Sequence, residues 1–223
     1  MKADKTKTVS AGEREVDIGL EKVTLHGNLS VPEGARGIVL FAHGSGSSRH
    51  SPRNRFVAGS LVERGIGALL FDLLTSEEEV MDNMTGQLRF DIDLLADRLK
   101  ETVSWVKNQG ELKDLNIGYF GASTGAAAAL MAAAQEPENV KAIVSRGGRA
   151  DMPANFLPRV QAPVLLLVGG NDPVIIDMNK FALKKLHCTS RMDIIPGATH
   201  LFEEPGALEK VAELAGKWFD EYL

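Results

Sequence analysis

Hydrophobic and polar residues alternate in two segments near the start of the chain, residues 15–20 and 22–31. A period of two predicts half-exposed antiparallel strands. From Gly37 the pattern changes to a continuous apolar run over residues 37–42, which is typical of a strand covered on both faces. Further strands are predicted by the later apolar runs, at residues 68–71, 117–120, 141–145, 164–168 and 191–195.

Segments with helical periodicity separate these strands. We predict helices over residues 53–65, 89–109, 124–135, 176–187 and 206–222, a short helix around 152–158 and an acidic loop over 75–87. The Glu77–Glu79 run is interpreted as a solvated loop or a helix N-terminus. Alternating strands and helices predict parallel strands joined by right-handed crossovers. We therefore expect one α/β domain over residues 15–223, after a polar segment at 1–14.

Length and charge narrow the function classes. A chain of 223 residues fits one α/β domain with a sizeable core. The net charge of −5 and the lack of a long basic run argue against a nucleic-acid partner. The single cysteine, Cys188, excludes an internal disulfide and a cysteine-based metal cluster. The polar start and the short apolar runs predict a cytoplasmic protein with no signal peptide and no membrane partner.

The most informative motif is Gly121-Ala122-Ser123-Thr124-Gly125, which lies between a predicted strand and an Ala-rich helix. A G-x-S-x-G pattern in this setting holds a serine hydroxyl out at the carboxyl end of a sheet. Small flanking residues allow the close backbone approach that such a turn requires. The motif therefore predicts that Ser123 is a nucleophile.

A nucleophilic serine needs a base and an orienting carboxylate, expected after later strands. His200 follows the strand at 191–195 in a Pro-Gly-Ala-Thr-His turn and is the predicted base. Asp172 closes the strand at 164–168 and is the preferred acid, although its position also suits a helix N-cap before Pro173. Asp151 satisfies the same chain order and is the alternative acid.

The oxyanion hole needs two backbone N–H groups. The first is predicted at Thr124, directly after the nucleophile. The second is predicted in the loop after residues 37–42, at Ser45 or alternatively at Gly46. A phosphate-binding loop is a weaker interpretation, because the chain has neither G-x-G-x-x-G nor Gly-Lys-Ser/Thr there.

Four segments in this order carry a family resemblance: Phe41–Gly46, Gly121–Gly125, Gly169–Asp172 and Gly197–His200. The chain resembles the α/β-hydrolases, and among them the small dienelactone-hydrolase-like members. The resemblance implies an α/β-hydrolase fold: about eight mostly parallel strands with the second antiparallel, and helices on both faces. It also implies a Ser-His-Asp triad and an acyl-enzyme mechanism. Dienelactone hydrolases proper use a cysteine nucleophile, so Ser123 favours serine-esterase chemistry over lactone hydrolysis.

The predicted activity is hydrolysis of a small-molecule carboxylic ester by Ser123, His200 and Asp172, with no metal and no cofactor. The chain has no long insertion after residues 141–145, so we expect no large lid domain. Thioester or amide cleavage, acyl transfer and perhydrolysis on the same triad are alternatives, as is a non-catalytic binding protein. The sequence leaves open whether the protein is a monomer or a homodimer.

Two arginines near the predicted site, Arg146 and Arg49, are candidates for binding a substrate carboxylate. The alternative is that the arginines of this region form structural ion pairs with Asp72, Asp91 or Asp151.

Overall fold

The computed structural model describes residues 12–223, so the polar segment predicted at 1–14 lies almost entirely outside the described residues. Eight strands form one sheet with the order β1-β2-β4-β3-β5-β6-β7-β8. The strands are β1 (Arg14–Gly19), β2 (Thr24–Ser30), β3 (Gly37–Ala42), β4 (Gly67–Phe71), β5 (Asn116–Ala122), β6 (Ala142–Arg146), β7 (Val164–Gly169) and β8 (Ser190–Ile195). The helices are α1 (Pro52–Glu63), α2 (Ser76–Thr85), η1 (Leu88–Phe90), α3 (Ile92–Asn108), α4 (Thr124–Gln135), η2 (Pro137–Asn139), η3 (Leu157–Arg159), α5 (Pro173–Leu183) and α6 (Ala207–Tyr222).

The strand directions confirm the mostly parallel α/β-hydrolase sheet. Strand β2 is antiparallel to both β1 and β4, whereas every pairing from β4 to β8 is parallel. The register places Ala122 beside Arg146 and Gly169 beside Ile195. The carboxyl ends of β5 to β8, and the loops that follow them, therefore meet at one edge of the sheet.

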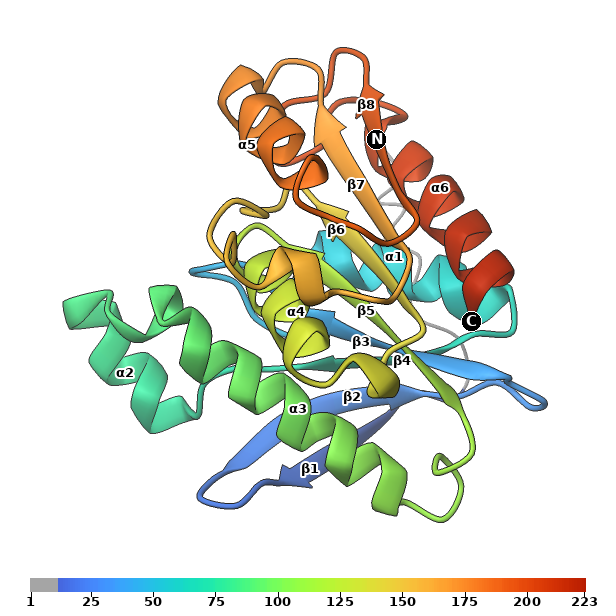
Figure 1. Cartoon of the computed structure of the whole chain (residues 1–223). Helices are drawn as coiled ribbons and strands as arrows, with labels where there is room; N and C mark the ends of the chain where they lie inside the picture. Colours follow the sequence, from blue (N-terminus) through green and yellow to red (C-terminus); the bar gives the residue numbers. More distant parts are fainter. Residues whose placement is uncertain (1–11) are drawn as a thin grey trace, which may run out of the picture.

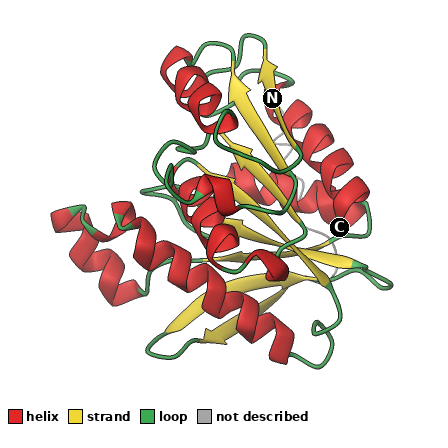
Figure 2. Ribbon diagram, in the orientation of Figure 1, coloured by secondary structure: helices red, strands yellow, loops and turns green. Residues whose placement is uncertain are grey.

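Helices cover both faces of the sheet (Figures 1 and 2). On one face α3 and α4 bury a core that includes Leu99 and Leu130. On the other face α1 packs against α6 over a core that includes Val57 and Phe219. The alanines of α4 are all buried, because small side chains allow this helix to lie close to the sheet behind Ser123.

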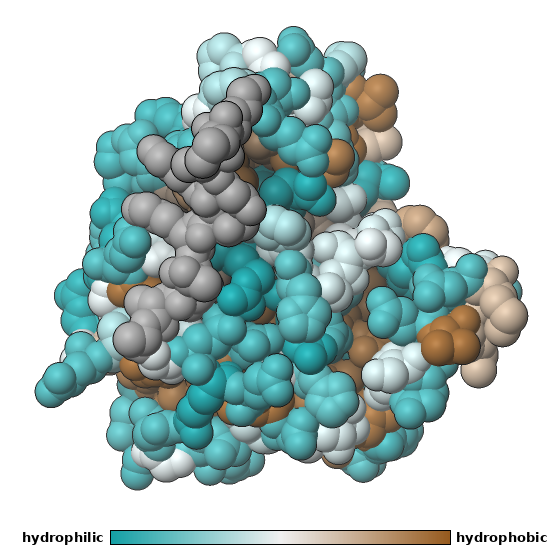
Figure 3. Space-filling model, turned by 180° about the vertical axis from the view of Figure 1, so that it is seen from behind, coloured by the Kyte–Doolittle hydropathy of each residue, from teal (hydrophilic) through white to brown (hydrophobic). Residues whose placement is uncertain are grey.

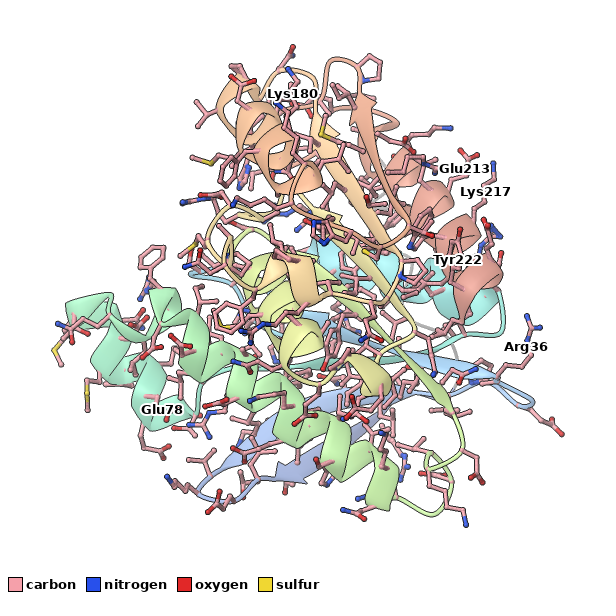
Figure 4. All side chains as sticks on the ribbon, viewed as in Figure 1. Arg36, Glu78, Lys180, Glu213, Lys217 and Tyr222 are labelled. Atoms are coloured by element: carbon pink, nitrogen blue, oxygen red, sulfur yellow. The ribbon has the colours of Figure 1, made fainter. Side chains whose placement is uncertain are left out.

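The prediction of a loop over residues 75–87 is wrong, because this segment contains α2. Thr75 caps the helix: its hydroxyl accepts a hydrogen bond from Glu78 N–H (3.2 Å), and Glu78 Oε2 accepts one from Thr75 N–H (2.8 Å). Glu78, which is labelled in Figure 4, also accepts through Oε1 a hydrogen bond from Arg98 of α3 (2.7 Å). The alternative interpretation of the acidic run as a helix N-terminus is correct, since Glu77–Glu79 form the first turn.

Helix α2 projects from the body of the molecule (Figure 1) and forms, with η1, a small excursion between β4 and α3. Apolar side chains are exposed on this projection, at Val80, Met81, Met84 and Phe90 (right side of Figure 3). No large lid domain is present in residues 12–223. Within the same residues, no helix is both long and apolar enough to cross a membrane.

The helix predicted over 176–187 and the short helix predicted around 152–158 also differ from the structure. Helix α5 begins at Pro173 rather than at 176, because Asp172 caps it and Pro173 occupies its first position. The helix predicted around 152–158 is a series of turns that ends in η3. Pro153 and Pro158 interrupt this segment, and each lacks the N–H that a longer helix would use.

Candidate active site

Ser123 lies in a strained turn between β5 and α4. Its backbone has φ 50° and ψ −120°, a left-handed conformation that is unfavourable for a residue with a side chain. The flanking glycines are required by close packing. A Cβ on Gly121 would lie 2.4 Å from the Cα of Ala126, and one on Gly125 would lie 2.2 Å from the carbonyl oxygen of Ala42.

The main chain of Ser123 is fixed to the loop that follows β6. Its N–H donates to the Arg146 carbonyl at 3.2 Å, and its own carbonyl accepts from the N–H groups of Ala126 (3.1 Å) and Arg149 (3.0 Å). These hydrogen bonds hold the strained turn in place, and the exposed end of the serine side chain keeps its position at the sheet edge.

The structure brings His200 and Asp172 together. The Nδ1 atom of His200 lies 2.8 Å from Asp172 Oδ2, while Asp172 Oδ1 accepts a hydrogen bond from Ile175 N–H at 3.4 Å as the N-cap of α5. One carboxylate thus makes both contacts considered from the sequence, one with the histidine and one as a helix N-cap. With Nδ1–H donated to Asp172, Nε2 of His200 is the acceptor that a serine hydroxyl requires.

No hydrogen bond joins Ser123 to His200 in the described part of the chain. Such bonds are often long without substrate and shorten in the reacting complex. The His200 side chain is 40% exposed and that of Asp172 is 15% exposed, so the histidine faces solvent and the carboxylate is shielded.

Hydrogen bonds attach the Asp172 loop to the His200 loop. The N–H of Asn171 donates to the Ala198 carbonyl (2.9 Å), and its side-chain amide donates to the Gly197 carbonyl (2.9 Å). The two loops approach so closely that a Cβ on Gly169 would lie 2.4 Å from the Ala198 carbonyl oxygen. The distance between acid and base is therefore fixed by their supporting loops.

The alternative acid, Asp151, is engaged elsewhere. Its two carboxylate oxygens accept from Nε and Nη2 of Arg149, each at 2.9 Å. This bidentate pair satisfies the carboxylate and raises the pKa of Arg149. Of the two acids considered, Asp172 is the one beside the histidine.

The predicted oxyanion loop lies against the nucleophile. A Cβ on Gly44 would lie 3.1 Å from the Cβ of Ser123, so only glycine fits there without displacement. The N–H of Ser45 donates to the Thr124 hydroxyl at 2.9 Å. Thr124 is the first residue of α4, where backbone N–H groups have no acceptor within the helix and carry its positive dipole end.

His43 supports this loop, a role that the sequence interpretation missed. Its Nε2 accepts a hydrogen bond from Leu73 N–H (3.1 Å), so its Nδ1 carries the hydrogen that is donated to the Gly44 carbonyl (3.0 Å). Burial lowers the pKa of His43, which keeps the ring neutral as this pattern requires. The only sequence signal was its position directly before Gly44 at the end of a strand.

The two candidate substrate-binding arginines differ in their surroundings. Arg49 forms an ion pair with Asp72, and its Nε donates to Asn28 at 3.1 Å. Arg146 is 8% exposed, and its Nη2 reaches only the Asn54 side-chain oxygen, at 3.4 Å. Burial, with a smaller contribution from the charge of Arg53, lowers the pKa of Arg146 to about 10, so it remains charged at neutral pH.

The structural ion pairs considered from the sequence exist for Arg49 with Asp72 and for Arg149 with Asp151. They do not extend to Arg146. No carboxylate of residues 12–223 forms an ion pair with it.

A small cavity of about 30 Å³ opens beside the oxyanion loop. This volume holds about two water-sized groups. It is bordered by the loop itself, by Thr124, and by residues from the segment after β4 and from α2, η1 and α3. The complete lining is His43, Gly44, Ser45, Gly46, Ser47, Asp72, Leu73, Leu74, Glu79, Asp82, Asn83, Arg89, Leu95 and Thr124.

Two Mycobacterium tuberculosis proteins with the provisional name phosphoribosyl transferase are 52% identical to the chain over 211 residues. The match covers 95% of the chain but only 47% of those proteins, so the chain spans about half the length of these curated relatives. Est1E from Butyrivibrio proteoclasticus shares the fold at 17% identity, with a TM-score of 0.76 over 93% of the chain and 98% of Est1E.

A dienelactone hydrolase from Anabaena variabilis is much more similar to this chain than Est1E is. It is 56% identical, and its crystal structure superposes with a TM-score of 0.93 over 95% of this chain and 98% of that one. Residues 25–221 match the dienelactone hydrolase family. The chain therefore belongs to the dienelactone hydrolase family, as the resemblance of its four motifs implied.

Proposed function

We propose that this protein is a serine hydrolase that cleaves small carboxylic esters through an acyl-enzyme intermediate. The observation that carries the proposal is the 2.8 Å contact of His200 with Asp172, at the sheet edge where Ser123 occupies a strained turn. Strained backbone persists where function needs it, and a shielded carboxylate against a histidine selects the ring tautomer that can accept a proton.

In the first half of the proposed reaction, Nε2 of His200 takes the hydroxyl proton as Ser123 attacks the ester carbonyl. Asp172 stabilises the imidazolium that forms, and the histidine returns the proton to the departing alcohol. In the second half, water attacks the acyl-enzyme by the same proton transfers. The residues perform this chemistry without a metal or an organic cofactor.

The oxyanion of the tetrahedral intermediate is stabilised by the N–H groups of Thr124 and Ser45. The Ser45 N–H donates to the Thr124 hydroxyl, and this contact holds it close to the N–H of Thr124, so that both groups can donate to the developing oxyanion. The acyl group enters the small cavity beside the Ser45 loop. The size of this cavity favours short acyl chains.

Membership of the family supports a hydrolase, and the identity of the proposed nucleophile narrows the class of substrate. The Anabaena variabilis relative is named a dienelactone hydrolase, whereas a serine at position 123 favours ester chemistry. The name phosphoribosyl transferase belongs to proteins about twice as long as this chain. The site geometry gives no comparable argument for that transfer reaction.

A fluorophosphonate probe followed by mass mapping tests the proposal. We expect covalent mass on Ser123 in the wild type and no labelling in His200→Ala. The matched control is His26→Ala, because His26 also contacts a carboxylate (Asp17, 2.8 Å) but lies in β2. Labelling in that control should equal the wild type. A folded wild-type protein that is not labelled would favour a non-catalytic binding role.

A further inference from the structure

The Arg146 guanidinium is a buried charge that has no carboxylate partner within residues 12–223. Its Nε and Nη1 are inaccessible to solvent and make no hydrogen bond. Its remaining contacts are Asn54, at 3.4 Å, and the Phe202 ring, whose centre is 5.9 Å away. An unpaired buried charge destabilises a folded chain, so its presence indicates a role in function.

A second arginine adds charge next to the first. Arg53, in the first turn of α1 beside Asn54, donates from Nη1 to Glu203 Oε1 at 2.7 Å, and its buried Nε also has no partner. Arg53 thus has one carboxylate partner and Arg146 has none, which leaves the two neighbouring guanidiniums with a net positive charge. The side chain of Glu203 is 60% exposed, so it can move into solvent and open this cluster.

The arginine cluster adjoins the catalytic base. Gly147 follows Arg146 with φ +53°, and a Cβ there would lie 3.4 Å from His200 Nδ1 and 3.3 Å from the Phe202 ring. Phe202 has φ 56°, a strained conformation that it shares with Ser123. Strained backbone therefore occurs at Ser123 and also at Phe202, two residues after His200.

The position of the arginine cluster beside His200 assigns the cluster to one half of the ester substrate. His200 protonates the departing alcohol, so the alcohol half of the substrate lies on the His200 side. The cavity beside Ser45 takes the acyl half. Of the three carboxylates in its lining, Asp72 is paired with Arg49 and Asp82 with Arg89, so Glu79 leaves the acyl side with a net negative charge. An anion is therefore repelled on the acyl side and attracted on the alcohol side.

We infer that Arg146 and Arg53 form a subsite that binds a phosphate group on the alcohol half of the ester substrate. This inference rests on the proposed function. The three unpartnered nitrogens belong to two guanidiniums, and the three terminal oxygens of a phosphate monoester can accept from both. A planar carboxylate suits one guanidinium edge. On binding, the phosphate displaces Glu203 from Arg53.

Four esters and three variants test the subsite. The substrates are the acetate esters of butanol, of 3-hydroxypropyl phosphate and of 4-hydroxybutanoate, together with monoethyl succinate, whose charge is on the acyl half. The variants are Arg146→Gln, Arg53→Gln and the control Arg55→Gln, since Arg55 is also on α1 but pairs with Glu13 at 3.1 Å.

We expect the wild type to have its highest kcat/KM on the phosphate ester. The ratio of this value to that of butyl acetate should fall roughly 10- to 100-fold in Arg146→Gln and Arg53→Gln, and stay constant in Arg55→Gln. An unchanged ratio in the first two variants would overturn the subsite. Preference for the hydroxybutanoate ester would overturn the choice of phosphate, and preference for succinate would overturn the assignment to the alcohol half.

A binding measurement separates this inference from the proposed function. If the fluorophosphonate probe labels Ser123 but the ratios do not change, the subsite fails and the hydrolase stands. If no ester is cleaved, inorganic phosphate still tests the site. It should raise the Tm of the wild type and not that of Arg146→Gln. The absence of such a rise in the wild type would overturn the subsite.

Discussion

The hydroxyl of Thr124 accepts a hydrogen bond from the N–H of Ser45, which joins the first residue of α4 to the loop after β3. This contact holds one proposed oxyanion donor 2.9 Å from the residue that supplies the other. The two donors therefore form one unit whose geometry depends on the side chain at position 124.

Thr124→Val tests this contact, since valine keeps the shape of threonine and removes the acceptor. The Ser45 loop should lose its position, and kcat on a short-chain ester should fall on the order of tenfold or more, with KM nearly constant. Thr124→Ser keeps a hydroxyl and should stay within a few-fold of the wild type. Equal rates for valine and wild type would show that the contact does not matter for catalysis.

Asp172 combines two roles that substitutions can separate. Asparagine remains a good N-cap, so Asp172→Asn should lower kcat by on the order of 10³- to 10⁴-fold with little loss of stability. Asp172→Ala should also lower the free energy of unfolding by about 1 kcal/mol. Activity assays and denaturant unfolding measure the two effects.

The matched control is Asp151→Asn, which breaks the bidentate pair with Arg149. It should keep most of the activity. A loss as large as that of Asp172→Asn would reassign the acid of the triad.

His43 predicts a pH dependence of stability. Its folded pKa lies below the ordinary value of 6.5, so the unfolded chain binds a proton that the folded chain excludes. The free energy of unfolding should therefore have its full value above pH 6.5 and fall as pH falls toward the folded pKa, by at most about 1.4 kcal/mol per pH unit. Denaturant unfolding of wild type and His43→Gln between pH 7.5 and 5 measures the difference, and the variant should lose less stability than the wild type over this range.

Two Gly-to-Ala substitutions should have opposite effects on stability. Gly125→Ala places a Cβ 2.2 Å from the Ala42 carbonyl oxygen, so β3 or the nucleophile turn must shift, and both Tm and kcat should fall. Gly59 lies in α1 with nothing within 4 Å of an added Cβ. Gly59→Ala should raise the free energy of unfolding by about 0.5–1 kcal/mol.

Arg146→Met should stabilise the protein, because it replaces an unpaired buried charge with an apolar side chain of similar length. We expect the free energy of unfolding to rise by roughly 1–3 kcal/mol. Thermal and denaturant unfolding measure the change. A destabilised variant would mean that the guanidinium is needed for folding rather than for ligand binding.

The strand pattern and the order of the motifs were sufficient to predict the sheet and the family. The positions of Ser123, Asp172 and His200 could be predicted because each follows the carboxyl end of a parallel strand, and these ends meet at one edge of the sheet. The choice between Asp172 and Asp151 needed the structure, since both follow strands and only a three-dimensional contact shows that Arg149 occupies Asp151.

The sequence interpretation was weakest where short-range signals compete. Residues 75–87 are acidic and polar, so they suggested a loop, yet the Thr75 and Glu78 capping pair starts a helix there. The isolation of Arg146 was also hidden from the sequence, because Asp151 lies only five positions away. The burial of Arg146, and the pairing of Asp151 with Arg149 instead of Arg146, became visible only in the three-dimensional structure.

The excursion formed by α2 and η1 has a consequence for how this scaffold can change its substrates. Residues 75–90 form one continuous stretch that lines part of the cavity proposed for the acyl group and contributes none of the proposed triad. In the proposed function, the triad and this wall of the acyl cavity therefore lie in separate stretches of the chain. Replacing this stretch as a cassette would exchange the acyl preference while the catalytic edge of the sheet stays the same.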